Sequence, residues 1–211
     1  MANFNTHITV AGIASLAATG ICLQADVITQ SQALLLLPLG MIAGILPDID
    51  SDHSVPARLV FTILSFAVAI ALVFSYQGTI SLFTLLLLAA AGGLFMRYII
   101  LYVFTRITVH RGLFHSLPAA LLSGLLMMLS GIHFLHWSLH FTWLAAAFVS
   151  GGYLLHLLLD EAYSVDFMGG DFKSSFGSAL TLFSTSAWIS YLLLYLAIGL
   201  GFAFAPLPAV I

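Results

Sequence analysis

Long apolar stretches, interrupted by short polar segments, dominate the pattern of this chain. In chain order the apolar segments are Ile8–Leu23, Ala33–Leu46, Ala57–Tyr76, Ile80–Phe104, Leu117–Gly131, Phe141–Leu159 and Ala187–Phe204. A helix needs about 20 apolar residues to cross a bilayer. The first two segments are shorter, so we expect them to be tilted, kinked at Pro38 or re-entrant. The pattern predicts an all-α, polytopic membrane helical bundle with about seven transmembrane segments.

Composition agrees with this prediction. The chain is 62% hydrophobic and only 6% charged, whereas about a quarter of the residues of a soluble domain are charged. A soluble globular protein is therefore excluded. No internal repeat or linker is visible, so we expect one integral membrane domain over residues 1–211. Basic residues form no run that would bind nucleic acid, and a single cysteine, Cys22, excludes a disulfide framework or thiolate cluster.

The few basic residues predict the topology. No Lys or Arg precedes the first apolar segment, so we expect no cleavable signal peptide. If all segments cross the membrane, the side that carries the N-terminus also carries Arg58, Arg106, Arg111 and Lys173. The loops of the other side carry no Lys or Arg. By the positive-inside rule, we expect the N-terminus of this multi-pass protein to be cytoplasmic.

Ionisable residues gather at the same predicted membrane boundary. They come from four separate stretches of the chain and are His7, Asp48, Asp50, Asp52, His110, His115, His156 and Asp160. Ionisable groups at membrane depth are costly and often functional. Because hydropathy and basic residues alone defined the topology, this convergence predicts a single site.

The spacing of several of these residues suits metal binding. His156 and Asp160 are four apart, so they share one face of a helix and can hold one ion. Pro47 is expected to end the preceding helix, and Asp48 and Asp50 are expected to lie on one edge of an extended turn.

Histidines around a glycine form a further candidate pair. His110 and His115 suit a bent loop in which the two imidazoles converge, and Ser116 with Pro118 is expected to cap and start the next helix. Imidazole and carboxylate ligands together favour Zn, Mn or Fe over Ca or Mg, which prefer oxygen ligands. We therefore expect one or two divalent ions, with zinc preferred.

Each candidate also has a purely structural explanation. Asp48 could cap a turn, His156 could be a hydrogen-bonded histidine of the bundle, and Asp160 could pair with Arg106 or Arg111. If all of these explanations held, many ionisable residues would have to lie at the same membrane face independently of one another. A single shared site is the simpler explanation, so we prefer it.

A second group of histidines is expected on the opposite side. His133, His136 and His140 lie near Trp137 and Trp143. This combination is typical of an interfacial aromatic belt rather than a metal site.

The polar blocks resemble the YdjM-like family of membrane-bound metal-dependent hydrolases. The resemblance is carried, in order, by Thr6–His7, LPDID at Leu46–Asp50, HRGLFHS at His110–Ser116 and GYLLHLLLD at Gly152–Asp160. It implies a multi-span bacterial inner-membrane protein with a metal centre that is likened to zinc-dependent phospholipase C. Those phospholipases are soluble, so the likeness covers ligand chemistry and not the fold.

Carried over position by position, the resemblance implies a set of site residues. The implied metal ligands are His7, Asp48, His110, His115, His156 and Asp160. Asp50 would be a ligand or a partner that orients one.

The leading hypothesis is hydrolysis of a lipid phosphoester by metal-activated water at the cytoplasmic boundary. A zinc-type ion lowers the pKa of a bound water to about 7, so that hydroxide is available near neutral pH. Arg111 is the candidate cation for the phosphate because guanidinium binds phosphate through two hydrogen bonds. Asp50 is the candidate general base or imidazole-orienting carboxylate.

Other functional classes remain open. Membrane His and Asp also occur in transporters of divalent metals or protons, although the segment centres here are mostly Leu, Ala, Phe and Val. A metal-stabilised scaffold without catalysis is a third hypothesis. Membrane lipid is the expected environment and possible substrate, nucleic acid is not an expected partner, and the sequence defines no protein partner.

The topology can be tested by cysteine labelling in a Cys22→Ala background. Cysteines at His53 and at Ser174, next to Asp52 and Lys173, should react only with a membrane-permeant reagent in intact cells, because both loops are expected to be cytoplasmic. A cysteine at Ser138 is the matched control and should react with the impermeant reagent. The reverse pattern would place the site on the outer side.

Overall fold

The computed structural model describes residues 3–50, 55–107, 113–164 and 180–206, apart from the side chains of Asp50 and Ile107. Over these residues the regular structure is helical, which confirms the predicted all-α membrane bundle. The described part divides into two compact units, residues 1–47 with 111–211 and residues 48–110. The prediction of one integral membrane domain over the whole chain stays a prediction.

Helix lengths agree with the predicted spans, with one correction. Five helical stretches are long and apolar enough to cross a membrane, namely Phe4–Gln24, Val55–Tyr76, Leu82–Arg106, Leu139–Ala162 and Thr185–Phe204. The prediction that the first segment is short was wrong. Asn3 accepts a hydrogen bond from the Thr6 backbone (2.8 Å) and caps the helix before His7, so it reaches 21 residues.

Two apolar helices are shorter than a full span. One has 14 residues and continues through Pro38, and the other has 17 residues. The second of these begins as the sequence predicts, because Ser116 Oγ accepts a hydrogen bond from the Ala119 backbone and Pro118 occupies the first turn.

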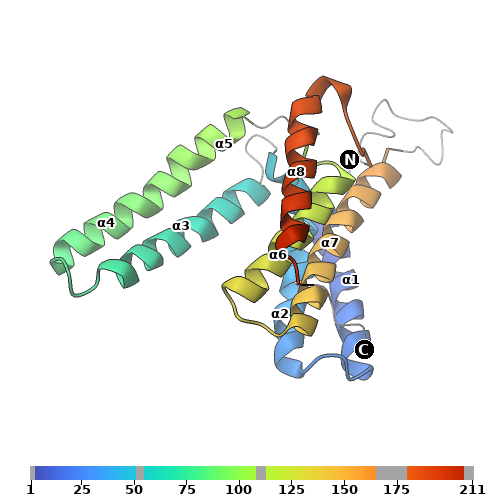
Figure 1. Ribbon diagram of the computed structural model, residues 1–211, viewed down its shortest axis with the longest axis horizontal. Coiled ribbons are helices and arrows are strands. Elements are labelled where there is room, and N and C mark those ends of the chain that lie inside the picture. Colours follow the sequence, from blue (N-terminus) through green and yellow to red (C-terminus); the bar gives the residue numbers. More distant parts are fainter. Residues whose placement is uncertain (1–2, 51–54, 108–112, 165–179, 207–211) are drawn as a thin grey trace. The chain divides into compact units, whose positions relative to one another are not determined.

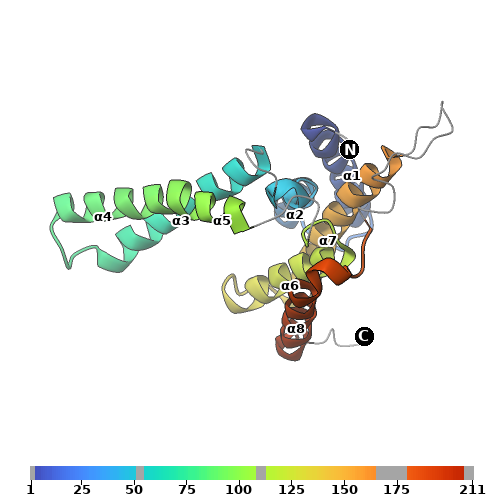
Figure 2. The same cartoon turned by 90° about the horizontal axis from the view of Figure 1, so that it is seen from above.

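The described residues of the first unit form a bundle of helices (Figures 1 and 2). They are α1 (Phe4–Gln24), α2 (Gln30–Ala43), α6 (Leu117–His133), α7 (Leu139–Ala162) and α8 (Trp188–Phe204), the last preceded by the short 3-10 helix η3 (Thr185–Ala187). α7 packs against α1, α2 and α6, while α8 packs on α6. Short connections make α1 and α2 antiparallel, and likewise α6 and α7. Thr181, shortly before α8, accepts a hydrogen bond from Leu117 at the start of α6, and His7 near the start of α1 contacts Asp160 near the end of α7. The helices α1, α6 and α8 therefore begin where α2 and α7 end. We call this the amino end of the unit.

The core of the first unit is built around α7. Ala146 packs with residues of α6 and α8, Phe141 and Ala145 pack with residues of α2, and Tyr153 and Leu157 pack with the start of α6. The same helix therefore anchors every buried apolar cluster found in the described residues, and it carries the polar residues of the amino end within this packed frame.

Glycines bring α2 and α7 into backbone contact. A Cβ on Gly152 would lie 2.3 Å from the Gly40 carbonyl oxygen, and a Cβ on Gly40 would lie 2.6 Å from Ser15 Oγ of α1. Gly152 thus serves the close packing that its sequence suggests. Gly151 does not, because a Cβ there would meet nothing within 4 Å.

The second unit is a helical hairpin. It consists of α3 (Val55–Tyr76), α4 (Leu82–Leu94), the π-helical segment η2 (Phe95–Ile100) and α5 (Leu101–Ile107). Gly93 lies against α3, since a Cβ there would be 3.2 Å from the Ser65 carbonyl oxygen, which agrees with the predicted close packing. Most side chains of the hairpin are exposed, and most of the exposed ones are apolar, as expected for helices in lipid.

Gly152→Ala should destabilise the first unit, because a methyl group cannot fit against the Gly40 carbonyl. Overpacking costs about 1–3 kcal/mol, and about 2–4 °C in Tm accompanies each kcal/mol for a chain of this size. Thermal unfolding of the purified protein in detergent measures this effect. Gly151→Ala is the matched control and should leave the Tm unchanged or raise it, since Ala favours helix. Equal Tm values for the two variants would contradict the backbone contact.

Candidate metal centre

Four of the predicted ligands lie together at the amino end of the first unit. His7 lies in the first turns of α1, His156 and Asp160 lie in the last turns of α7, and His115 directly precedes the Ser116 cap of α6. All four are at most 2% exposed. Such buried ionisable groups require partners inside the protein.

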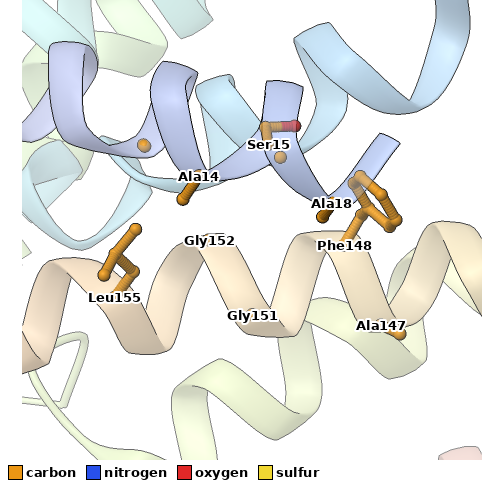
Figure 3. Close-up of a pocket in the computed structure, with 10 residues that line it drawn as sticks. Ala14, Ser15, Ala18, Ala147, Phe148, Gly151, Gly152 and Leu155 are labelled. Carbon is orange, nitrogen blue, oxygen red and sulfur yellow. The ribbon is translucent and has the colours of Figure 1, made fainter. Parts of the chain in front are cut away.

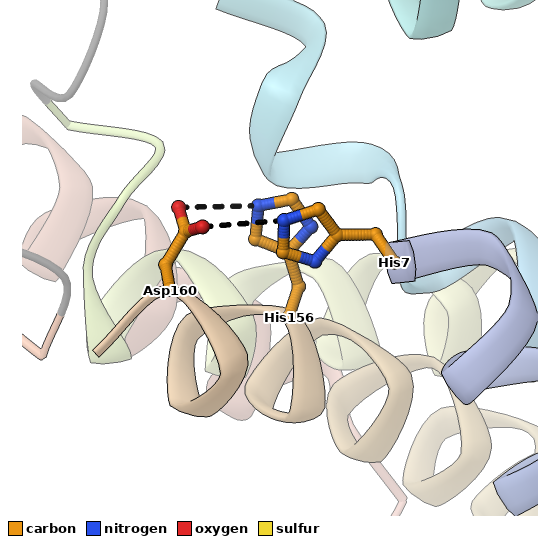
Figure 4. Close-up of side chains that lie close together, drawn as sticks. All are labelled: His7, His156 and Asp160. Carbon is orange, nitrogen blue, oxygen red and sulfur yellow. Dashed lines mark hydrogen bonds and ion pairs between the residues drawn. The ribbon is translucent and has the colours of Figure 1, made fainter. Parts of the chain in front are cut away.

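Asp160 is the centre of this cluster (Figure 4). Its Oδ1 lies 3.2 Å from His7 Nε2, and its Oδ2 lies 3.7 Å from both His115 Nε2 and His156 Nε2. His156 and Asp160, four residues apart on α7, therefore share one face of the helix and approach each other, as the sequence predicts. Three imidazoles converge on one carboxylate.

The imidazole rings pack closely against each other. His7 stacks on His156 with ring centroids 3.6 Å apart and an interplanar angle of 13°, and His115 meets His156 edge-on with centroids 5.7 Å apart. The stacking aligns the rings of α1 and α7, so their Nε2 atoms lie on the same side, toward Asp160.

His156 is oriented by a backbone carbonyl. Its Nδ1 lies 2.8 Å from the Gly44 carbonyl oxygen, which can only accept a hydrogen bond. Nδ1 must therefore donate the hydrogen, and in the neutral ring Nε2 carries the lone pair. A histidine held in this way by a carbonyl on its far nitrogen is the usual arrangement of a metal-ligating histidine.

Gly44 is the C-cap of α2, where helix carbonyls lack intrahelical donors. A Cβ at this position would lie 2.3 Å from the Cβ of Ala11 in α1, so only glycine fits. The carbonyl that orients His156 is thus available because α2 ends here and because α1 approaches it closely.

The backbone around His115 is fastened on two sides. Tyr153 of α7 donates its hydroxyl to the Phe114 carbonyl, and Thr181 Oγ1 donates to the His115 carbonyl at 3.0 Å. The Leu117 backbone in turn donates to the Thr181 carbonyl at 3.0 Å. These contacts fix the loop that presents His115 to Asp160.

The sequence analysis did not identify Gly44, Tyr153 or Thr181 as contributors to the site. Tyr153 precedes His156 by one helical turn, so its shared face with the ligand was a usable signal. Gly44 acts through its backbone carbonyl, and Thr181 acts through both its hydroxyl and its carbonyl on the backbone next to His115. Residue type alone does not reveal such roles.

The geometry of His7, His156 and Asp160 fits a bound metal ion. Ligand atoms chosen from the three lie within 4.8 Å of one another. Two ligands at about 2.1 Å from a tetrahedral ion are roughly 3.4 Å apart, and the measured nitrogen–oxygen separations of 3.2 and 3.7 Å bracket that value. The cluster also offers His7 Nδ1, which is buried and has no hydrogen-bond partner in the described part of the chain.

The LPDID motif differs locally from its prediction. Leu46–Asp50 forms the 3-10 helix η1, not an extended turn. The prediction of an extended turn was therefore wrong. Pro47 in the first turn and an acidic residue near the helix start both favour the helical form.

The remaining predicted site residues belong to the second unit or fall outside the described part of the chain. Asp48 is half-buried and begins the second unit, and its membership in the ligand set stays a prediction. His110 and Arg111 lie outside the described residues, as do Asp52 and Lys173, and the Asp50 side chain is outside them as well.

The second histidine group is found where the sequence places it. His133, His136 and His140 are exposed at the end of the unit opposite the cluster, where α6 ends and α7 begins. His140 Nε2 lies 3.2 Å from the Val27 carbonyl. Among the described residues, no potential metal site includes these histidines.

Comparison with known proteins gives one match. No curated protein and no solved structure matches the chain. A family model described as YdjM inner membrane protein matches residues 1–205, nearly the whole length of the chain. The apolar helices and the polar blocks that carried the sequence resemblance lie within the matched range. The chain therefore belongs to the YdjM inner membrane protein family, whose members it joins as a multi-pass membrane protein with a buried His/Asp cluster that could bind a metal ion.

Proposed function

We propose that this protein is a metal-dependent hydrolase that cleaves a phosphoester of a membrane lipid. The observation that carries the proposal is the convergence of three buried imidazoles on the Asp160 carboxylate at one end of the membrane helices. Lipid phosphoesters lie in the headgroup region that borders the hydrocarbon core. We expect the ends of membrane-spanning helices, and with them this cluster, to lie near that region.

His7, His156 and Asp160 would hold the ion. His115 would either be a further ligand or orient Asp160, whose Oδ2 lies 3.7 Å from His115 Nε2. Mixed nitrogen and oxygen donors favour zinc, with manganese and iron as alternatives, and one or two ions are compatible with the proposal. We expect Asp48 and His110 to add ligands, as the family resemblance implies. The Gly44 carbonyl keeps His156 in the tautomer that binds metal.

A bound ion of this type would lower the pKa of water and polarise a phosphoryl oxygen. The residues of the chain supply positioning and charge around it. Arg111 is proposed to hold the phosphate through two parallel hydrogen bonds. Asp50 is proposed to accept a proton from water or to orient a histidine. Burial of the cluster strengthens each of these electrostatic interactions.

The distribution of polar groups supports hydrolysis over transport. Midway along α1 and α7 the buried polar side chains are hydroxyls, such as Ser15, which donates to the Leu37 carbonyl at 2.9 Å. The buried ionisable side chains of the described residues lie at the amino end instead. A metal or proton pathway needs such groups across the bilayer, so transport and a non-catalytic scaffold become outcomes of the activity test.

Loss of a ligand should remove the metal. Loss of a residue that only orients a metal ligand lowers metal affinity roughly 10- to 100-fold. We expect His156→Ala and Asp160→Asn, which remove ligands themselves, to lower zinc affinity by at least this factor. Elemental analysis of protein dialysed against buffered zinc measures this. His140→Ala, an exposed histidine at the opposite end, should keep full metal content. Equal metal content in all three variants would remove His156 and Asp160 from the ligand set.

Arg111→Lys should keep metal binding and lose activity, because lysine retains the charge but not the paired hydrogen bonds. Such a bond in a low-dielectric site contributes on the order of 2–4 kcal/mol to the transition state, which is roughly a thirty- to several-hundred-fold loss of rate. The assay is release of head group or phosphate from a panel of lipid phosphates by metal-loaded protein.

The same assay can overturn the proposal. If no phosphoester is cleaved by fully metallated protein, transport or a scaffold role replaces hydrolysis. If Arg111→Lys and Asp50→Asn are both fully active, hydrolysis stands but neither residue has the proposed role.

A further inference from the structure

An apolar groove opens between α1 and α7 (Figure 3). Its volume is about 280 Å³. It is lined mainly by small side chains and includes Ala14, Ala18, Gly40, Ala147, Phe148 and Gly151. The volume is close to the lower limit of about 300 Å³ for small-molecule pockets, so a slender ligand fits it better than a bulky one.

The wall of the groove is chemically suited to hydrocarbon. Ser15 is the one lining residue with a polar side chain, and its Oγ donates to the Leu37 carbonyl of α2. Both flanking helices are long and apolar enough to cross a membrane, and next to the groove Ile13 and Leu16 are at least 60% exposed. The medium around the groove is therefore lipid, and the nearest abundant slender apolar ligand is an acyl chain.

One glycine of the groove has no packing role. Gly40 and Gly152 are small because neighbouring atoms lie against them, whereas a Cβ on Gly151 would enter open space. Glycine inside a helix costs roughly 0.5–1 kcal/mol relative to alanine. A Cβ on Gly20 or Gly199 would also meet no neighbouring atom, so open space at a glycine does not by itself indicate a binding site. Of these three glycines, Gly151 is the one that lines the groove.

The groove begins directly beside the metal-ligand cluster. Ala11, one of its lining residues, follows His7 by one helical turn, and Leu155, another, immediately precedes His156. Going away from the cluster, the lining continues to Ala18 on α1 and Ala147 on α7. At 1.5 Å per residue these stretches measure roughly 10–12 Å, which is most of the roughly 15 Å depth of one leaflet.

We propose that this groove binds one acyl chain of a membrane lipid whose phosphate-bearing head lies at the His7, His156 and Asp160 cluster. Binding of the chain stands on the groove itself. The further statement that the bound acyl chain belongs to the substrate rests on the proposed hydrolase function. In that case the groove selects lipid substrates over water-soluble phosphoesters, because the chain holds the scissile bond at the depth of the ligands.

The experiment uses a photoreactive lipid and needs no catalysis. Metal-loaded protein is reconstituted in vesicles of phosphatidylethanolamine and phosphatidylglycerol that contain phosphatidylglycerol with a diazirine midway along one acyl chain. After illumination, mass spectrometry locates the adducts. We expect several-fold more adducts on the groove residues of α1 and α7 than on Leu192 and Leu196, which are 55% and 59% exposed on α8. Adducts that simply follow exposure would overturn the proposal.

Variants that fill the groove provide a second measurement. Gly151→Leu should lower groove adducts several-fold, while Gly199→Leu, the same change at an open glycine of α8, should not. Ala147→Leu fills the groove from an exposed position and serves if Gly151→Leu does not fold, with bound metal as the check. Unchanged groove adducts in folded Gly151→Leu or Ala147→Leu would also overturn the proposal.

The outcomes separate this inference from the proposed function. Enriched groove adducts without cleavage of any lipid phosphate would support the groove and reject hydrolysis. Lipid hydrolysis with adducts that follow exposure would support the enzyme and reject the groove. If both stand, Gly151→Leu should lower turnover of a long-chain lipid phosphate at least tenfold more than turnover of a soluble phosphoester.

Discussion

The contact between the backbones of α2 and α7, at Gly40 and Gly152, determines how the amino end of the first unit is built. It lets α2 end close enough to α7 for the Gly44 carbonyl to accept a hydrogen bond from His156. The orientation of His156 and the access of its Nε2 to Asp160 follow from that bond. In lipid there is no hydrophobic drive between helices, so contacts of this kind hold such a bundle together.

Burial of polar groups is the second constraint. Each ion that is removed from water costs several kcal/mol unless partners compensate, and the Asp160 carboxylate is 2% exposed. Three imidazoles from separate parts of the chain surround it. Those contacts offset part of the cost, and a divalent ion would offset more, since it brings positive charge to the carboxylate and uses the lone pairs of neutral histidines. The geometry is therefore compatible with a bound metal ion.

The cluster and the groove use the same two helices for different purposes. Near the amino end α1 and α7 approach through His7 and His156, whose rings are stacked, and further along small side chains of both helices line the groove. A lipid that spans both would have its polar part at the ligands and its apolar part against alanine and glycine. The groove would thus give the proposed hydrolase a physical reason to prefer a lipid substrate.

Much of this arrangement could be predicted from the sequence, because two of its causes are local. Hydropathy predicts the apolar helices from the length of each run, and the spacing of His156 and Asp160 predicts their shared face. The expected topology also predicts that distant His and Asp residues gather at one end of the helices, as His7, His115, His156 and Asp160 do. Membrane depth is nearly a one-dimensional coordinate, and the sequence determines it well.

Only the tertiary structure decided what lies beside what at that depth. The 3-10 conformation of Leu46–Asp50, the selection of the Gly44 carbonyl as the partner of His156, and the difference between Gly151 and Gly152 depend on which helices approach and how closely. Residue type carries little information about these features. A backbone carbonyl is present at every position, so the sequence does not show which one will accept a hydrogen bond. A glycine is the same residue in the sequence whether its lack of a side chain makes room for a neighbouring helix or leaves a groove open.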